Sequence, residues 1–92
     1  MPQVVIVAQV EDGERWETEF RTHGELFRSQ TINNPIRFSV SDENEVAILF
    51  EPEDQATYLE ILDSPATHEA MEHDGVKRDT VQIYLLDKSF QP

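Results

Sequence analysis

The sequence predicts an α+β domain in which helices cover one face of a four-stranded antiparallel sheet. Two observations lead to this prediction. Short runs rich in β-branched and other apolar residues, as expected of strands, stand at residues 3–10, 36–40, 46–50 and 81–86. After the first of these runs, and again after the third, apolar residues recur at helical spacing. The predicted order is therefore strand, helix, strand, strand, helix, strand.

The first strand and the first helix follow directly from local composition. Residues 3–10 read QVVIVAQV, which is apolar at nearly every position and predicts a strand buried on both faces. Asp12 is placed to cap a helix predicted from Gly13 to Phe27 or Arg28. Gly24 lies inside that span and weakens a helix by roughly 1 kcal/mol relative to alanine. Either something packs closely against Gly24, or the helix frays there.

The second and third strands form a predicted hairpin. Apolar residues at 36, 38 and 40 alternate with polar ones, which indicates a strand with one polar face. Residues 41–44 read SDEN and predict the connecting loop. Residues 46–50 are again apolar on both faces. Pro52 ends this strand because it has no N–H group to donate to a neighbouring strand.

The second helical region is predicted to begin at Glu53 or Asp54 and to be interrupted at Ser64 and Pro65. Serine is a good N-cap, and proline fits the first position of a new helix. Gly75 is predicted to end this region in a left-handed conformation. The last strand, at residues 81–86, carries apolar residues on both faces.

This βαββαβ order is the ferredoxin-like arrangement, and 92 residues make a single domain spanning residues 1–92. Its helices lie on one face of the sheet, yet three of the predicted strands are apolar on both faces. Something else must cover the remaining face, and the simplest candidate is the same face of a second copy. We therefore predict a homodimer formed through the open face of the sheet.

Composition limits the classes of partner. The chain has 19 acidic and 7 basic residues and a net charge of −12, which disfavours nucleic acid and anionic membranes as partners. An acidic surface with few lysines also suits a high-salt habitat; the alternative is an ordinary acidic protein. The absence of cysteine excludes disulfides, thiolate metal sites and cysteine catalysis. The apolar run near the start is too short for a leader or a membrane span, so a cytoplasmic protein is predicted.

One apolar stripe on the first predicted helix contains a titratable residue. Trp16, Phe20, His23 and Phe27 fall within roughly 60° of one another on a helix. A neutral imidazole near pH 7 can take a proton from a carbon or hydroxyl acid, which makes His23 the leading candidate for a catalytic base. The three aromatic residues could line a cavity for a planar ligand. The alternative is that all four side chains are ordinary core.

Three further side chains are candidates for binding a substrate. Arg37, on the polar face of the second strand, could hold an enolate or carboxylate, or could simply pair with a surface carboxylate. Tyr58 and Tyr84 could hydrogen-bond a ligand or stabilise an oxyanion. Tyr84 lies within a predicted strand and could instead belong to the dimer face.

The histidines on the second helical region do not predict a metal site. His68 and His73 lie five residues apart, about 140° around a helix, so they cannot share one ion. The pairs four residues apart, His68 with Glu72 and Glu69 with His73, supply two ligands each, whereas zinc takes at least three from the protein. We predict surface ion pairs and no bound metal.

Three stretches make the chain resemble a known superfamily: Trp16-x3-Phe20-x2-His23, the segment SPATHEAM at residues 64–71, and Gly75-Val76. The chain resembles the dimeric α/β-barrel superfamily, which includes the antibiotic-biosynthesis-monooxygenase-like proteins. The resemblance implies that two facing sheets form a barrel between subunits and that each monomer has a ligand cavity between helices and sheet. Characterised relatives include cofactor-free oxygenases, haem-degrading enzymes, dehalogenase-like and isomerase-like enzymes, and stress-induced proteins.

The resemblance and the stripe lead to two functional predictions. The first is a cofactor-independent oxygenase or isomerase that acts on a small apolar or aromatic carbonyl or phenolic compound. His23 would be its base, and Arg37 or a tyrosine would steady the anion. The second is a non-catalytic module of the same fold that binds a small ligand or acts in stress. Haem is a minor alternative, since a helical histidine ligates iron in the haem-degrading relatives, but their wider motifs are not matched here.

Overall fold

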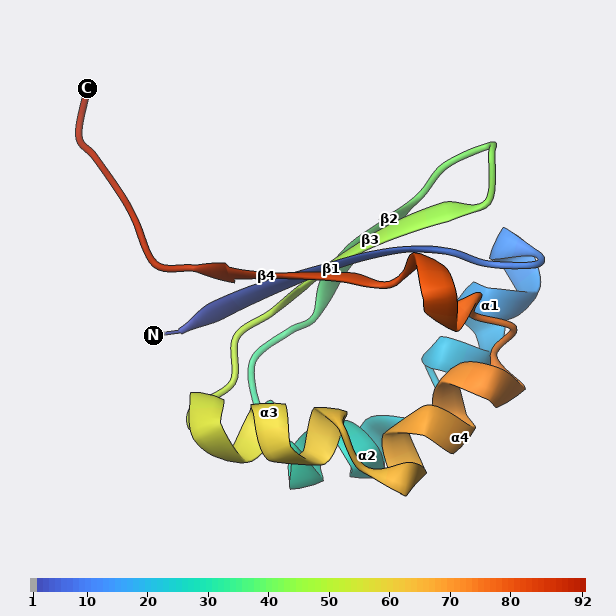
Figure 1. Cartoon of the computed structure of the whole chain (residues 1–92), viewed down its shortest axis with the longest axis horizontal. Coiled ribbons are helices and arrows are strands. Elements are labelled where there is room, and N and C mark those ends of the chain that lie inside the picture. The colour runs from blue at the N-terminus through green and yellow to red at the C-terminus, as the bar shows by residue number, and fades with distance from the viewer. Residues whose placement is uncertain (1) are drawn as a thin grey trace.

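A four-stranded antiparallel sheet carries the helices on one of its faces (Figure 1). The computed structural model describes residues 2–92. The strands are β1 (Gln3–Gln9), β2 (Arg37–Val40), β3 (Glu45–Phe50) and β4 (Gln82–Leu86). They lie in the order β2-β3-β1-β4, and each neighbouring pair is antiparallel. The predicted ferredoxin-like arrangement is confirmed.

Two pairs of short helices take the places of the two predicted helical regions. The first pair is α1 (Gly13–Phe20) and α2 (Gly24–Ser29), and the second pair is α3 (Gln55–Leu62) and α4 (Pro65–His73). A single 3₁₀ turn, Arg78–Thr80, leads into β4. All four helices lie beneath the sheet in Figure 1, while the chain after β4 runs away from the body of the domain.

The predicted helix starts, and the predicted end of the second helical region at Gly75, are confirmed. The carboxylate of Asp12 accepts two backbone N–H groups of α1, at 3.0 and 3.3 Å. Asp54 caps α3 in the same way at 3.2 Å, and Ser64 caps α4, whose first residue is Pro65. Gly75 follows α4 with a φ of 78°, in the left-handed region that glycine enters at little cost.

The prediction of one continuous first helix is wrong, because the helix is interrupted between Phe20 and Gly24. The hydroxyl of Thr22 donates to the carbonyl of Glu19 at 2.6 Å, and a threonine that bonds the backbone in this way competes with helical pairing. The N–H groups of Thr22 and His23 turn to carbonyls three residues back, at 3.0 and 3.3 Å. The low helix propensity of Gly24 adds to the break.

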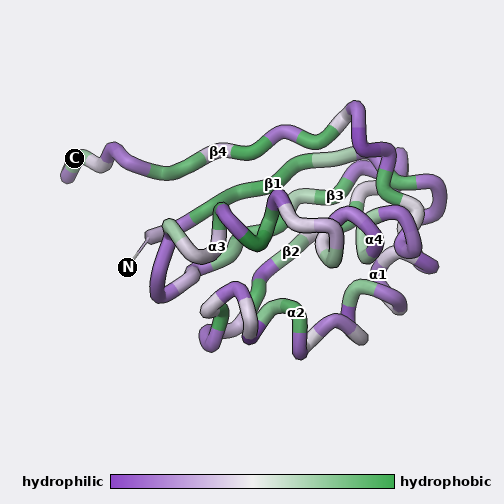
Figure 2. The backbone as a smooth tube through the Cα atoms, turned by 60° about the horizontal axis from the view of Figure 1, so that its bottom comes forward, coloured by the Kyte–Doolittle hydropathy of each residue, from purple (hydrophilic) through white to green (hydrophobic). Residues whose placement is uncertain are grey.

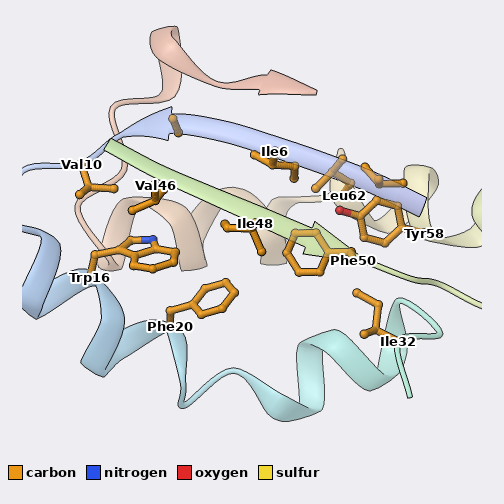
Figure 3. Packing of buried hydrophobic residues seen from close by; sticks show 12 residues of the cluster. Ile6, Val10, Trp16, Phe20, Ile32, Val46, Ile48, Phe50, Tyr58 and Leu62 are labelled. Atoms are coloured by element: carbon orange, nitrogen blue, oxygen red, sulfur yellow. The ribbon is translucent and has the colours of Figure 1, made fainter. Parts of the chain in front are cut away.

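The core lies between the sheet and the helices (Figure 3). Every second residue of β1 and β3 points towards the helices and is buried, which is the period-2 pattern of a strand. The helices and the loop after α2 supply the opposing side of this core. Its buried members are Val4, Ile6, Ala8, Val10, Trp16, Phe20, Ile32, Val46, Ile48, Phe50, Tyr58 and Leu62.

The other face of the sheet carries apolar side chains that no helix covers. Val5 of β1 pairs with Leu49 on one side and with Tyr84 on the other, so these three residues form a row across the sheet. Tyr84 is 49% exposed and Leu86 is 51% exposed. Figure 2 shows β4 as the outermost strand, with hydrophobic segments along it. The predicted two-sided apolar pattern is therefore present, and the helices cover one side of it.

Candidate functional site

A cavity of about 60 Å³ lies between the sheet and the helices, beneath His23. All four helices contribute to its wall, and β1, β3 and the segments next to β4 supply the rest. Its lining is mostly apolar, with a few polar groups among the aromatic and aliphatic side chains. The lining residues are Ile6, Trp16, Phe20, His23, Leu26, Phe27, Gln30, Val46, Ile48, Phe50, Tyr58, Leu62, Thr67, Ala70, Met71, Asp74, Val76 and Val81.

The predicted aromatic stripe forms one wall of this cavity despite the break in the first helix. The rings of Trp16 and Phe20 stack with their centroids 4.5 Å apart, and Phe20 and Phe27 follow at 5.0 Å. The ring of His23 stands edge-on to Phe27 at 6.4 Å. Aromatic pairs at such distances stabilise a core beyond the area that they bury. All four predicted residues therefore lie together at the cavity.

His23 is held by a buried carboxylate that sequence reasoning missed. Its Nε2 lies 2.9 and 3.0 Å from the two carboxylate oxygens of Asp74, and Asp74 is 4% exposed. An ionised carboxylate only accepts hydrogen bonds, so the proton on His23 lies at Nε2 and Nδ1 is the basic nitrogen. No other side chain or backbone group within residues 2–92 bonds to Nδ1. The pair is the arrangement of a carboxylate that orients a general base.

Burial governs the electrostatics of Asp74. It raises the pKa of the Asp74 carboxyl, because a charged group loses its hydration there. The hydrogen bond from His23, together with the charges of His23 and His73, offsets part of this effect and lowers the pKa again. Asp74 follows α4 directly and precedes Gly75. Nothing in the linear sequence connects it with a histidine 51 positions away.

Tyr58 lines the apolar cavity and carries a buried hydroxyl. The residue is fully buried, and its hydroxyl has no hydrogen-bond partner among the residues that the structure describes. Its ring lies 5.7 Å from that of Phe50, and Figure 3 shows both at the opposite end of the core from Trp16. Burial raises the pKa of the Tyr58 phenol far above its usual value, so the group is a neutral donor at pH 7. The sequence prediction for Tyr58 is consistent with this position.

Replacing Tyr58 with phenylalanine should change how stability depends on alkaline pH. A phenol whose pKa is raised on folding favours the folded state fully below about pH 10, and this contribution is lost as the pH rises further. The variant lacks that loss, so its stability relative to wild type should grow by up to about 1.4 kcal/mol per pH unit above 10. Urea unfolding of wild type and variant at pH 8 and pH 11 measures this difference in stability. Parallel curves for wild type and Tyr58→Phe would contradict the assignment.

Two further polar residues at the cavity were also missed from the sequence. Gln30 is 2% exposed, and its side-chain amide donates to the Thr67 hydroxyl at 3.2 Å. That hydroxyl in turn donates to the carbonyl of Ile61 at 2.6 Å. The chain of bonds fixes the end of α2 to the start of α4. Thr67 satisfies the backbone at a helix junction, a role that single-sequence patterns do not reveal.

Arg37 and Tyr84 do not lie at the cavity, and the structure separates them from the other predicted site residues. Both stand on the open face of the sheet, where Arg37 pairs in register with Leu49 of β3. The Tyr84 hydroxyl donates to the side-chain carbonyl of Gln82 at 2.8 Å. The period-2 alternation of their strands already predicts that both side chains lie on the face of the sheet away from the buried residues. For Arg37, the sequence indicated this directly, because it lies on the polar face of its strand.

The ion pairs predicted within the second helical region are wrong. His73 bonds to Glu19 of α1 at 2.8 Å rather than to Glu69, and His68 lies 3.5 Å from Asp63 rather than beside Glu72. Partners from α1 and from the preceding turn lie closer than those one helical turn away. Glu19, His73 and Asp74 together form the one cluster of potential metal ligands within residues 2–92.

The cavity size restricts what can bind. A volume of about 60 Å³ lies well below the roughly 300–1,000 Å³ of pockets that enclose drug-sized ligands. Haem does not fit a cavity of this size in its present shape.

None of the described helices is long and apolar enough to span a membrane.

Comparison with solved structures shows the same fold across the whole chain. A suggested antibiotic biosynthesis monooxygenase of Bordetella bronchiseptica matches with a TM-score of 0.72 at 13% identity, covering 97% of both chains. SnoaB, a cofactor-independent oxygenase of Streptomyces nogalater, matches at 0.71 and 14% identity, covering 98% of this chain and 94% of SnoaB. An Arabidopsis thaliana protein matches at 0.66 and 17% identity, covering 100% and 99%.

No protein-family model and no curated protein sequence match this chain. At these levels of identity the solved structures establish the fold, and the activity has to be argued from the site. The chain has the ferredoxin-like fold of the antibiotic-biosynthesis-monooxygenase-like proteins, as its sequence motifs suggested.

Proposed function

We propose that the cavity beneath His23 binds a small apolar or aromatic compound with a carbonyl or phenolic group, and that His23 removes a proton from it. The protein would act as a cofactor-independent oxygenase or isomerase. The observation that carries this proposal is the His23–Asp74 pair at 2.9 Å in the wall of an apolar cavity. Asp74 fixes the imidazole so that Nδ1 is the acceptor, which is what a general base requires.

Tyr58 supports the same assignment from inside the cavity. A neutral phenol in an apolar environment is a strong hydrogen-bond donor to a developing enolate or phenolate oxygen. Its buried hydroxyl has no protein partner among the described residues, so a ligand oxygen that reached it after the lining side chains moved would satisfy it. A ligand that bears an acidic proton near His23 and an oxygen near Tyr58 would satisfy both groups.

The chemistry balances without a cofactor. In an isomerase, His23 would take a proton from one carbon and return it to another, with no net oxidation. In an oxygenase acting on a quinol, loss of a hydroxyl proton to His23 gives a phenolate. Molecular oxygen, the named oxidant, would then add to a ring carbon of this anion, and loss of one water from the resulting hydroperoxide would leave a hydroxy-substituted quinone that keeps one of the two oxygen atoms. SnoaB is described as a cofactor-independent oxygenase, which is consistent with this choice.

The size of the cavity favours a ligand no larger than one ring. The cavity that accommodates benzene in a well-studied case measures about 150 Å³, more than twice the volume here. Even a single ring therefore requires the lining side chains to move. The helix break next to His23 lies at this wall, and its backbone has fewer helical hydrogen bonds to lose.

The alternative function is a non-catalytic module that binds a small ligand in the same cavity. The small volume and the mostly apolar lining favour this alternative, because they suit binding of a small apolar ligand without any reaction. The same lining residues would bind the ligand. His23 and Asp74 would then hold it by a hydrogen bond only.

Turnover of hydroquinone, a single-ring quinol, separates the two functions. An oxygen electrode should record uptake with wild-type protein. His23→Gln, which retains an N–H donor for Asp74 but is not a base, should lose about 10²–10⁴-fold in rate. His68→Gln, changed at a histidine outside the cavity, is the control and should keep the wild-type rate. Binding of hydroquinone without oxygen uptake would favour the non-catalytic module, and an active His23→Gln variant would rule out His23 as the base.

We also propose that a second copy of the chain covers the open face of the sheet. The exposed side chains of Tyr84 and Leu86, on the open face of β4, support it, since soluble monomers rarely leave such an apolar face uncovered. Light scattering should report a dimer at micromolar concentration. A cytoplasmic location stays a prediction from the sequence.

A further inference from the structure

Three side chains offer metal-ligand atoms to one point beside the cavity. Glu19 on α1, His73 at the end of α4 and Asp74 just after it each place one such atom within 4.8 Å of the other two. Nε2 of His73 lies 2.8 Å from a carboxylate oxygen of Glu19. Ligands around a zinc ion stand about 2.0–2.2 Å from the metal, hence roughly 3–3.5 Å from one another. Small side-chain rotations would bring the three atoms to these distances.

The buried carboxylate of Asp74 has unused capacity to bind a cation. Both of its oxygens face a single N–H group, that of His23 Nε2, and no other hydrogen bond to this carboxylate occurs within residues 2–92. An ionised carboxylate can accept about four hydrogen bonds, and a buried one is costly unless it is paired. At 4% exposure, water has little access to the remaining lone pairs. A second cationic partner would relieve this deficit.

The end of α4 that carries two of these ligands is fixed from outside. Arg15 of α1 donates to the backbone carbonyl of His73 at 3.0 Å. The N–H of Glu11 donates to the carbonyl of Gly75 at 2.9 Å. These contacts hold His73 and Asp74 against α1, so the ligand atoms from the two helices face each other before any ion arrives.

We propose that Glu19, His73 and Asp74 bind a divalent first-row transition-metal ion, with His23 holding Asp74 in position through its Nε2–H. One imidazole nitrogen and two carboxylate oxygens suit an ion such as Zn²⁺ or Mn²⁺ better than Ca²⁺, which takes six or more oxygens. Three protein ligands leave open positions on the ion. Hydrogen bonding of a ligating carboxylate by a neighbouring residue is usual in such sites. The net charge of −12 favours a cation.

The sequence does not reveal this site, because its ligands come from two different helices. Glu19 and His73 lie 54 positions apart and meet only because α1 packs beside the end of α4. The proposed ion lies outside the predicted chemistry of His23, whose basic nitrogen is the opposite one. Metal binding can therefore be tested without any measurement of turnover.

Calorimetric titration of the full chain with ZnCl₂, and visible absorption with CoCl₂, test this proposal. One Zn²⁺ should bind per chain, and Co²⁺ should give the absorption bands of a site with protein nitrogen and oxygen ligands. Glu19→Gln and His73→Ala, both at accessible positions, should each weaken Zn²⁺ binding at least about tenfold. MgCl₂ at the same concentration should leave the titration unchanged.

Two further variants distinguish a built site from a generally acidic surface. His68→Ala removes a histidine that also lies near a carboxylate but outside the cluster, and it should bind Zn²⁺ as wild type does. His23→Gln keeps an N–H donor for Asp74 and should retain binding, whereas His23→Ala should lose about 10–100-fold. Absence of Zn²⁺ binding would overturn the proposal, and so would equal losses in His68→Ala and His73→Ala. Circular dichroism without metal establishes that each variant is folded.

Discussion

Replacing Leu49 with glutamate should convert the proposed dimer to a monomer at micromolar concentration. Leu49 lies near the centre of the open face, in the row with Val5 and Tyr84. A carboxylate buried there without a partner costs roughly 3–5 kcal/mol, which weakens association at least about hundredfold. The negative charge of each chain adds repulsion between the two copies.

Light scattering on a dilution series measures this effect. The matched control is Ala66→Glu, which adds the same charge at an exposed position of α4, on the helical side of the domain. It should leave the dimer intact. A wild-type protein that is already monomeric would contradict the dimer proposal, and a Leu49→Glu variant that remains dimeric would move the interface elsewhere.

Replacing Trp16 with alanine should cost about 3–5 kcal/mol of unfolding free energy. Trp16 is 1% exposed, stacks on Phe20 at 4.5 Å and meets the ring of Phe38 edge-on at 5.6 Å. Its removal leaves a large cavity where α1 packs on the sheet. Because single domains of this class are stable by only about 5–15 kcal/mol, the variant should be near the edge of folding.

Urea unfolding monitored by circular dichroism gives the difference directly. Phe90→Ala is the control: Phe90 is also aromatic, but it is 87% exposed, and its loss should change stability by less than about 0.5 kcal/mol. A loss below about 1 kcal/mol for Trp16→Ala would mean that this residue does not anchor the first helix to the sheet.

Strand and helix positions were predictable because their signals are local. The alternation around β2, the unbroken apolar runs of β1 and β3, and the turn residues between them fix the order of elements. Asp12, Ser64 and Gly75 cap or end helices through contacts with residues only a few positions away. Such contacts are visible in a single sequence.

The break in the first helix was harder to predict, although its cause is also local. Gly24 signalled a weak point, but the helical spacing from Trp16 to Phe27 suggested one continuous helix. The helix is interrupted by the hydrogen bond from the Thr22 hydroxyl to the backbone and by backbone hydrogen bonds that reach three residues back instead of four. The aromatic residues still converge, because a short interruption between α1 and α2 leaves both helices on the same face of the sheet (Figure 1).

The polar part of the site could not be predicted, because its contacts join distant segments. His23 meets Asp74, Glu19 meets His73, and the positions of these pairs depend on how α1 packs against α4. Arg37 shows that residue type alone does not place a side chain. A guanidinium suits an anion, but the alternation of β2 puts Arg37 on the open face, away from the cavity. Residue type suggests chemistry, whereas tertiary packing decides which side chains meet.

A cavity-filling substitution tests most directly whether the cavity beneath His23 is the ligand site. Ala70 of α4 lines the cavity, and leucine at this position replaces a methyl group with an isobutyl group that would occupy the space. Ala66→Leu adds the same group on the exposed side of α4 and is the matched control. Both variants are first shown to be folded by circular dichroism.

Hydroquinone binding is then followed by amide chemical shifts in nuclear magnetic resonance spectra. Wild type and Ala66→Leu should bind, with the largest shifts at His23, Tyr58 and their neighbours, while Ala70→Leu should lose binding. Undiminished binding by Ala70→Leu, or shifts centred on the open face around Tyr84, would show that the cavity beneath His23 is not the ligand site.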